Sequence, residues 1–194
     1  MYTIKKKGSD NIPTITITDY IDNGGYCTKV VFSVTYSDEG FHVHYDAYEK
    51  NPKRVMTKHF DPVHLDSCVE WFINFDPEHT GNYINFEVNA NGVINFAWRP
   101  DRYTGEPFTK DEADSLNIKT EILDDKWTVD YTVPFALIKK YTPEYEFKKG
   151  AVLPSNVYKC GDETEVEHYG CWKMVDREKP DFHRPEYFGR MIIE

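Results

Sequence analysis

The sequence lacks long apolar runs and an export leader. No stretch of its 194 residues approaches the ~20 consecutive apolar residues that a membrane helix needs. The first residues, MYTIKKKGSDN, carry charges with no apolar segment behind them, which is not the pattern of a signal peptide. As the sequence stands we therefore expect a cytoplasmic protein that does not enter the membrane, and only the prior removal of a leader would make it a secreted one.

Positive charge is also scarce. Lys and Arg number 23 against 33 Asp and Glu, which gives a formal net charge of −10. Nucleic acids and anionic membranes are bound through clusters of cations. The longest basic run is residues 5–7, at a terminus that we expect to be loose. This balance argues against both classes of partner and leaves the oligomeric state open.

Familiar catalytic and metal-binding motifs are missing. There is no GxSxG, no P-loop and no GxGxxG. Cys27, Cys68, Cys160 and Cys171 form no CxxC pair, so we expect reduced thiols, some of them buried, rather than a zinc site built from all four. The acidic segment 74–81 lacks the spaced ligands of an EF-hand, yet an irregular structural calcium site stays open, because calcium needs only clustered oxygens.

Aromatic residues are plentiful at 15%, with 14 Tyr, 12 Phe and 4 Trp. Aromatic side chains are favoured in strands, so this composition is typical of a β-protein. It also suits a site in which rings stack on a planar ligand or a sugar. The two interpretations are compatible.

Residues 68–76, 83–89 and 93–98 alternate between apolar and polar side chains, which predicts three consecutive antiparallel strands. Asn91-Gly92 predicts a tight hairpin between the last two, since both residues tolerate positive φ. One face of this sheet is apolar and requires a second layer to cover it.

The opposite face of the same strands is rich in carboxylates and amides. It carries Glu70 on the first strand and Asn85 and Glu87 on the second. By default we expect these three side chains to be solvated. A pair of carboxylates held about 5–9 Å apart, one with a raised pKa, is also the machinery of glycoside hydrolysis, so Glu70 and Glu87 are an alternative catalytic pair.

Seven further segments have strand-like alternation or composition: residues 28–36, 41–48, 118–123, 127–133, 151–159, 169–174 and 188–193. One short helix is predicted near 134–141, with proline in its first turn, and residues 109–112 have the composition of another helix start. The chain is therefore predicted to be a single all-β domain over residues 1–194. Its expected architecture is a two-sheet antiparallel β-sandwich, jelly-roll-like, with that one short helix.

Two other groups of residues could carry chemistry. His42 and His44 lie on one strand face, roughly 7 Å apart by strand rise, which is compatible with a transition metal. A metal-binding sandwich that uses this pair is a weaker alternative function. The C-terminal segment 170–191 gathers aromatic and cationic side chains that form either a cap on the core or one wall of a ligand site: Trp172, Phe182, His183 and Arg184.

Four segments together resemble the family 9 carbohydrate-binding modules, and especially a stand-alone branch related to the xylanase-borne modules. They are DSCVEWFINF at 66–75, NYINFEVNANG at 82–92, WTVDYTVPFALI at 127–138 and HYGCWKMVDREKPDFHRPEYFG at 168–189. The resemblance implies a non-catalytic β-sandwich that binds a neutral glycan such as xylan, often at its reducing end, and that serves carbohydrate catabolism alongside glycoside hydrolases. The implied partner is a mono- or oligosaccharide.

The resemblance also implies ligand-binding residues. Glu70 matches the family glutamate, and Asn85 and Glu87 fall where the family module has a glutamine and an arginine. Phe182 falls at a ring-stacking tryptophan of the tail, with His183 and Arg184 beside it. A second family tryptophan falls near residues 63–64, where this sequence has Val-His, and Trp172 or a loop aromatic is the expected substitute.

Overall fold

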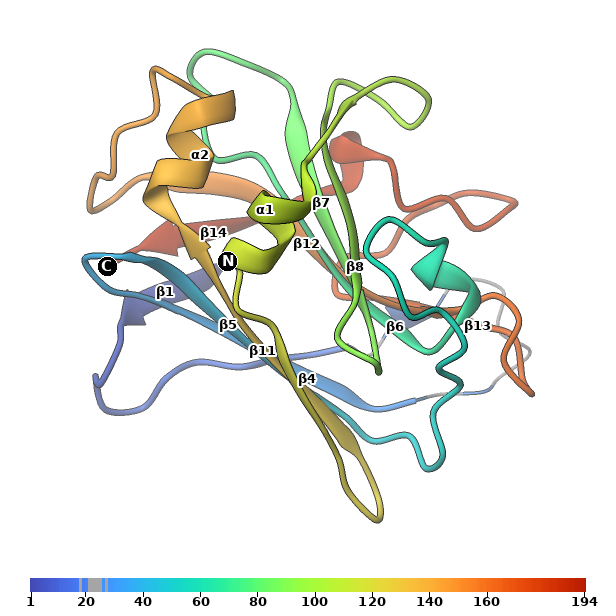
Figure 1. Cartoon of the computed structure of the whole chain (residues 1–194). Coiled ribbons are helices and arrows are strands. Elements are labelled where there is room, and N and C mark those ends of the chain that lie inside the picture. Colours follow the sequence, from blue (N-terminus) through green and yellow to red (C-terminus); the bar gives the residue numbers. More distant parts are fainter. Residues whose placement is uncertain (18, 21–25, 27) are drawn as a thin grey trace.

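The computed structural model describes residues 1–17, 19, 20, 26 and 28–194, and Cys27 lies outside them (Figure 1). Strands dominate the described residues. They are β1 (Tyr2–Lys6), β2 (Ile15–Thr16), β3 (Asp19–Tyr20), β4 (Val30–Tyr36), β5 (Gly40–Ala47), β6 (Cys68–Ile73), β7 (Tyr83–Asn89), β8 (Ile94–Arg99), β9 (Glu106–Pro107), β10 (Lys119–Ile122), β11 (Trp127–Pro134), β12 (Val152–Gly161), β13 (His168–Cys171) and β14 (Gly189–Ile193).

The described strands form one continuous, curled sheet whose main path runs β10-β11-β5-β4-β1-β14-β12-β6-β7-β8-β9. β1 joins the two halves, because Tyr2–Ile4 pair with β14 and Lys5–Lys6 pair with β4, both in parallel. The expected two-sheet antiparallel arrangement is therefore only partly right. Most pairings are antiparallel, but the halves are continuous through β1. The expectation of a loose basic terminus is wrong for the same reason.

The two halves pack face to face around the main core, and the strands of one half cross those of the other (Figure 1). Trp71 of β6 lies 6.0 Å from Phe32 of β4, and Phe86 of β7 lies 6.0 Å from Tyr131 of β11, measured between ring centroids. These rings come from the apolar faces that the alternation predicts. Fully burying a large aromatic side chain contributes about 1.5–3 kcal/mol, so this interface dominates the stability of the fold.

The polar face of β6 and β7 is not solvated, contrary to expectation. Glu70, Asn85 and Glu87 are 3%, 0% and 5% exposed. A second apolar cluster covers this face, with Phe72 and Tyr83 from the sheet and Phe182 from the segment between β13 and β14. The sequence pattern predicts the face of each side chain correctly, but the distant tail decides its burial.

Two short α-helices and two 3₁₀ turns complete the described elements: η1 (Val63–Leu65), α1 (Lys110–Ser115), α2 (Phe135–Tyr141) and η2 (Pro185–Tyr187). α2 lies where a helix is predicted and begins after Pro134. α1 begins where residues 109–112 indicate a second helix start, with a capping box between Thr109 and Glu112. Neither helix in the described part of the chain is long and apolar enough to cross a membrane.

Candidate functional site

A cavity of about 220 Å³ opens between the covered face of the sheet and the segment that follows β13. It is lined by side chains from five strands, from η1 and from three loops: His64, Glu70, Glu87, Asn95, Arg99, Arg102, Cys160, Asp162, Tyr169, Pro180, Asp181, Phe182 and His183. Four of the residues singled out in the sequence line it, namely Glu70, Glu87, Phe182 and His183. The central ribbon and the C-terminal tail therefore converge on one cavity.

The two glutamates are direct neighbours on adjacent strands. Glu70 of β6 is opposite Glu87 of β7 in the antiparallel register, so both side chains point to the same face. Burial, together with the charge of Glu87, raises the pKa of Glu70 well above its ordinary range. These side chains were expected to be solvated, which would leave their pKa values unshifted. Their burial removes that condition. The protonated form of Glu70 is therefore favoured more strongly in the fold than in water.

Glu87 is held by amides. Asn85 Nδ2 donates to one of its oxygens at 2.7 Å and Asn95 Nδ2 donates to the other at 3.1 Å. Burial raises the pKa of Glu87, and these two hydrogen bonds oppose the rise. Arg99 Nε in turn donates to Asn85 Oδ1 at 2.8 Å. Asn85 does not line the cavity but fixes two groups that do, so the polar wall is rigid before any ligand arrives.

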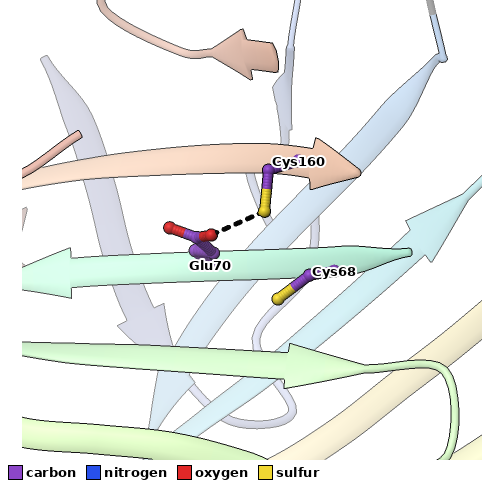
Figure 2. Close-up of side chains that lie close together, drawn as sticks. All are labelled: Cys68, Glu70 and Cys160. Carbon is purple, nitrogen blue, oxygen red and sulfur yellow. Dashed lines mark hydrogen bonds between the residues drawn. The ribbon is translucent and has the colours of Figure 1, made fainter. Parts of the chain in front are cut away.

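Two cysteines lie beside Glu70, and one of them, Cys160, lines the cavity. Cys68 of β6 is opposite Cys160 of β12 in the register, and Cys160 Sγ donates to Glu70 Oε1 at 2.8 Å (Figure 2). Burial raises the pKa of Cys68 to about 12. Cys68, Cys160 and Cys171 are buried, in agreement with the expectation that some of the thiols are buried.

The tail forms the opposite wall and is tied to the sheet. The Phe182 ring stacks on Tyr158 at 4.1 Å between centroids, and the Tyr158 hydroxyl donates to the Phe182 carbonyl at 3.2 Å. His183 Nδ1 shares a hydrogen bond of 2.8 Å with the Tyr83 hydroxyl. Burial and the nearby charges of Arg99 and Arg102 lower the pKa of His183 to about 3, so its imidazole is neutral.

Trp172 and Arg184 do not line this cavity. Trp172 packs against the main core and is close to the backbone of Gly189, where an added Cβ would meet its ring at 2.9 Å. Arg184 Nε lies 2.5 Å from Asp181 Oδ2. Arg184 therefore supports the wall through Asp181, and Trp172 belongs to the scaffold rather than to the cavity.

His42 and His44 lie on the other half of the sheet. His42 Nδ1 bonds to Thr132 Oγ1 at 3.0 Å, and His44 Nδ1 bonds to Asp130 Oδ1 at 2.8 Å. Within the described ranges, neither histidine belongs to a cluster of three side chains able to hold a metal ion. Their ring nitrogens are used for cross-strand hydrogen bonds, which suits an exposed polar face.

Several lining residues were not predicted from the sequence, including His64, Arg99, Arg102 and Tyr169. Arg99 follows directly from strand register, because it pairs with Tyr83 at the end of β8. His64 lies on η1, where the family tryptophan falls. Arg102 and Tyr169 come from a loop and from β13, and no periodicity in the sequence relates them to Glu87.

Comparisons with known proteins agree with this fold. The model of the family described as carbohydrate-binding family 9 matches residues 7–193. No sequence among the curated proteins matches the chain. A crystal structure of a candidate carbohydrate-binding protein from Bacteroides uniformis superposes with a TM-score of 0.82 at 19% identity, covering 100% of this chain and 99% of that one.

Two further structures come from a family 9 module of Caldicellulosiruptor kristjanssonii. The complex with glucose has a TM-score of 0.71 at 12% identity and covers 99% of this chain and 94% of that one. The complex with cellotriose has a TM-score of 0.70 at 11% identity and covers 100% and 93%. Since the family model spans nearly the whole sequence, the chain belongs to carbohydrate-binding family 9.

Proposed function

We propose that the cavity binds a carbohydrate, with one terminal sugar ring of a neutral mono- or oligosaccharide held between the polar sheet face and the tail. Family membership supports carbohydrate binding, and the Caldicellulosiruptor module has been crystallised with glucose and with cellotriose. The observation that carries the proposal for this chain is the set of hydrogen-bond donors and acceptors around Glu87, which are held in place without a ligand.

A sugar presents a rim of hydroxyl groups that both donate and accept hydrogen bonds. The cavity offers the Glu87 carboxylate as an acceptor and the guanidinium groups of Arg99 and Arg102 as donors. Asn85 and Asn95 already hold Glu87 in place. A site whose polar groups are fixed before binding loses little conformational entropy when the ligand arrives. The family module has an arginine where this chain has Glu87, and Arg99 of the adjacent strand provides the guanidinium instead.

The apolar part of the site is smaller than the aromatic content suggests. Tyr158 covers one face of the Phe182 ring, which is 8% exposed, so only the remainder of the ring is free for a sugar C–H face. Tyr169 lines the same cavity. These two rings replace the expected role of Trp172.

Size and charge narrow the ligand class. A cavity of about 220 Å³ is below the roughly 300–1,000 Å³ of sites for drug-sized molecules, which favours one enclosed sugar unit with the rest of a chain outside. Four acidic side chains line it against two arginines: Glu70, Glu87, Asp162 and Asp181. This balance favours neutral sugars over uronic acids or sulfated glycans.

Isothermal titration calorimetry against glucose, cellotriose, xylo-oligosaccharides and a uronic acid tests the proposal. We expect binding of at least one neutral sugar and a loss of about 10-fold or more in affinity for Glu87→Gln, because a charge-assisted hydrogen bond contributes about 1.5–3 kcal/mol. Glu121→Gln, at an exposed position of β10, is the matched control and should bind like the wild type. Absence of heat with every sugar, or equal affinity for Glu87→Gln, would refute it.

Glycoside hydrolysis at Glu70 and Glu87 is a second candidate, favoured by one observation. A buried carboxyl with a raised pKa beside another carboxylate is the pattern of a general acid and its partner. Release of reducing sugar from the same glycans, absent in Glu70→Gln, would support it. Binding without release supports the non-catalytic role that the resemblance implies.

A further inference from the structure

Three potential metal ligands meet beside the cavity, and two of them, Glu70 and Cys160, line it. The side-chain donor atoms of Cys68, Glu70 and Cys160 all lie within 4.8 Å of one another, and all three residues are buried. Figure 2 shows Cys68 and Glu70 on β6 and Cys160 on the neighbouring β12, with the Cys160 sulfur directed at the Glu70 carboxyl. Metal binding by these three side chains does not depend on the sugar binding proposed above.

Strand pairing holds this cluster in place. Cys68 and Glu70 are two residues apart on one strand and so share a face. Cys160 is opposite Cys68 in a register that continues over six residue pairs of β6 and β12. Because central strands of a sheet are rigid, the three ligands would need little ordering to bind an ion.

The ligand types select a class of ion. Two sulfurs and one carboxylate oxygen suit Zn²⁺ and similar thiophilic cations, whereas Ca²⁺ and Mg²⁺ prefer oxygen ligands alone. With Zn–S near 2.3 Å and Zn–O near 2.1 Å, tetrahedral coordination would separate sulfur and oxygen by about 3.6 Å. Cys160 Sγ and Glu70 Oε1 are now 2.8 Å apart, so a side-chain adjustment below about 1 Å would admit the ion.

The buried acidic groups around this cluster also favour a cation. Glu70 and Glu87 are buried neighbours, and in the described part of the chain Glu70 takes part in no ion pair. Buried acidic groups without a counter-ion are costly unless they stay protonated or bind a metal. A divalent ion would accept Glu70 in its ionised form.

We propose that Cys68, Glu70 and Cys160 form a binding site for a thiophilic divalent cation, best matched by Zn²⁺, with its fourth position open toward the cavity. Glu70 and Cys160 both line the cavity, so a water or a ligand oxygen can reach that position. Three protein ligands with one open position are typical of accessible zinc sites, unlike the closed four-ligand structural sites. Strand pairing, rather than CxxC spacing, brings the two thiols together, and Cys171 is not part of the cluster.

The test uses the full chain, reduced and without a histidine tag, titrated first with Co²⁺ and then with Zn²⁺. We expect one Co²⁺ per chain with a thiolate-to-cobalt absorption band that Zn²⁺ abolishes by displacement. Cys68→Ser and Cys160→Ser should each lose the band and at least about 100-fold in Zn²⁺ affinity, because each removes one of three ligands. Cys171→Ser is the matched control and should keep both.

Circular dichroism of each variant checks that the sheet is intact. A wild-type protein with fully reduced thiols that shows no cobalt–thiolate band would overturn the proposal, and so would a Cys68→Ser variant that binds Zn²⁺ as tightly as the wild type. Calorimetry with glucose, run with and without Zn²⁺, reports separately on sugar binding. The two proposals can therefore fail independently.

Discussion

Two buried glutamates, Glu49 and Glu70, have opposite surroundings. Glu49 is 8% exposed and meets Lys159 Nζ at 3.3 Å, the Ser67 hydroxyl at 2.8 Å and the Trp127 indole N–H at 3.1 Å. Burial pushes the pKa of Glu49 upward, but these partners outweigh it and leave the pKa below its ordinary value.

Glu70 is 3% exposed and has one thiol donor and a neighbouring carboxyl. Its pKa moves in the other direction, upward. Burial raises the pKa of both carboxyls, and the partners of Glu49 outweigh that rise whereas those of Glu70 do not. Glu49 is satisfied by the protein and stabilises the packing between the halves, whereas Glu70 is left with bonding capacity that a ligand can use.

The largest expected effect comes from removing the cation beside Glu49. Lys159→Met leaves a buried carboxylate without its counter-charge, and we expect the free energy of unfolding to fall by about 3–5 kcal/mol. Urea denaturation at neutral pH measures it. The double variant Lys159→Met/Glu49→Gln should recover part of the loss, because it removes the orphaned charge as well. An unchanged stability of Lys159→Met would show that the interior pair is not structural.

The pH dependence of stability should separate the two glutamates. Ionised Glu49 stabilises the fold above about pH 4.5, and this contribution is lost as the pH falls through its lowered folded pKa. Glu70 behaves oppositely: wild-type stability relative to Glu70→Gln is greatest below about pH 4.5 and declines as the pH rises toward the raised folded pKa.

Denaturation of the wild type, Glu49→Gln and Glu70→Gln from about pH 2 to pH 8 tests this, because the change at Glu49 falls below about pH 4.5. Each pKa unit of difference corresponds to about 1.4 kcal/mol. As the pH increases, the free energy of unfolding of the wild type should rise relative to Glu49→Gln and fall relative to Glu70→Gln. Parallel curves for both variants would contradict the contrast.

A smaller effect is expected at the aromatic wall. Phe182→Ala removes a ring that lines the cavity and packs on Tyr158, and we expect sugar affinity to fall by about 10-fold, or about 1.4 kcal/mol. Calorimetry with the best ligand of the sugar panel measures it. Phe182→Leu, which keeps an apolar side chain at the wall, should retain more of the affinity. Full retention by Phe182→Ala would remove this ring from the site.

The smallest effect is expected at Trp172, which packs against the core away from the cavity. Trp172→Phe should change sugar affinity by less than about two-fold, since the site residues stay in place. Thermal unfolding of the same variant should show a modest loss of stability. A ten-fold loss of affinity here would mean that the tail tryptophan contacts ligand after all.

Much of the sheet could be predicted from local pattern. The strand over residues 83–89 has the observed bounds of β7, and α2 begins after the proline that predicts it. β6 ends at Ile73 rather than at residue 76, because Asn74 leaves the strand and its side chain bonds within the turn, to the Asp76 N–H and the Thr80 carbonyl. Such local competition by asparagine is not visible in an alternation of polar and apolar residues.

The site was less predictable, for a physical reason. Alternation places Glu70 and Glu87 on one face, and the resemblance adds Phe182, but burial depends on a tail about a hundred residues away in the sequence. The same applies to Arg102 and Tyr169, which no register relates to the central strands. Trp172 was expected in the site as a substitute for the missing family tryptophan, and its packing partners assign it to the core.

The parallel pairing of β1 has a consequence for how the protein folds. Tyr2–Ile4 pair with the strand that ends at Ile193, so the contact that joins the two halves of the sheet links segments from opposite ends of the sequence. Contacts of such long sequence separation form late and slow the reaction, because the entropy of closing a large loop is lost before they stabilise anything. During synthesis on the ribosome, β1 can therefore connect the two halves only after β14, the last strand of the chain, has been made.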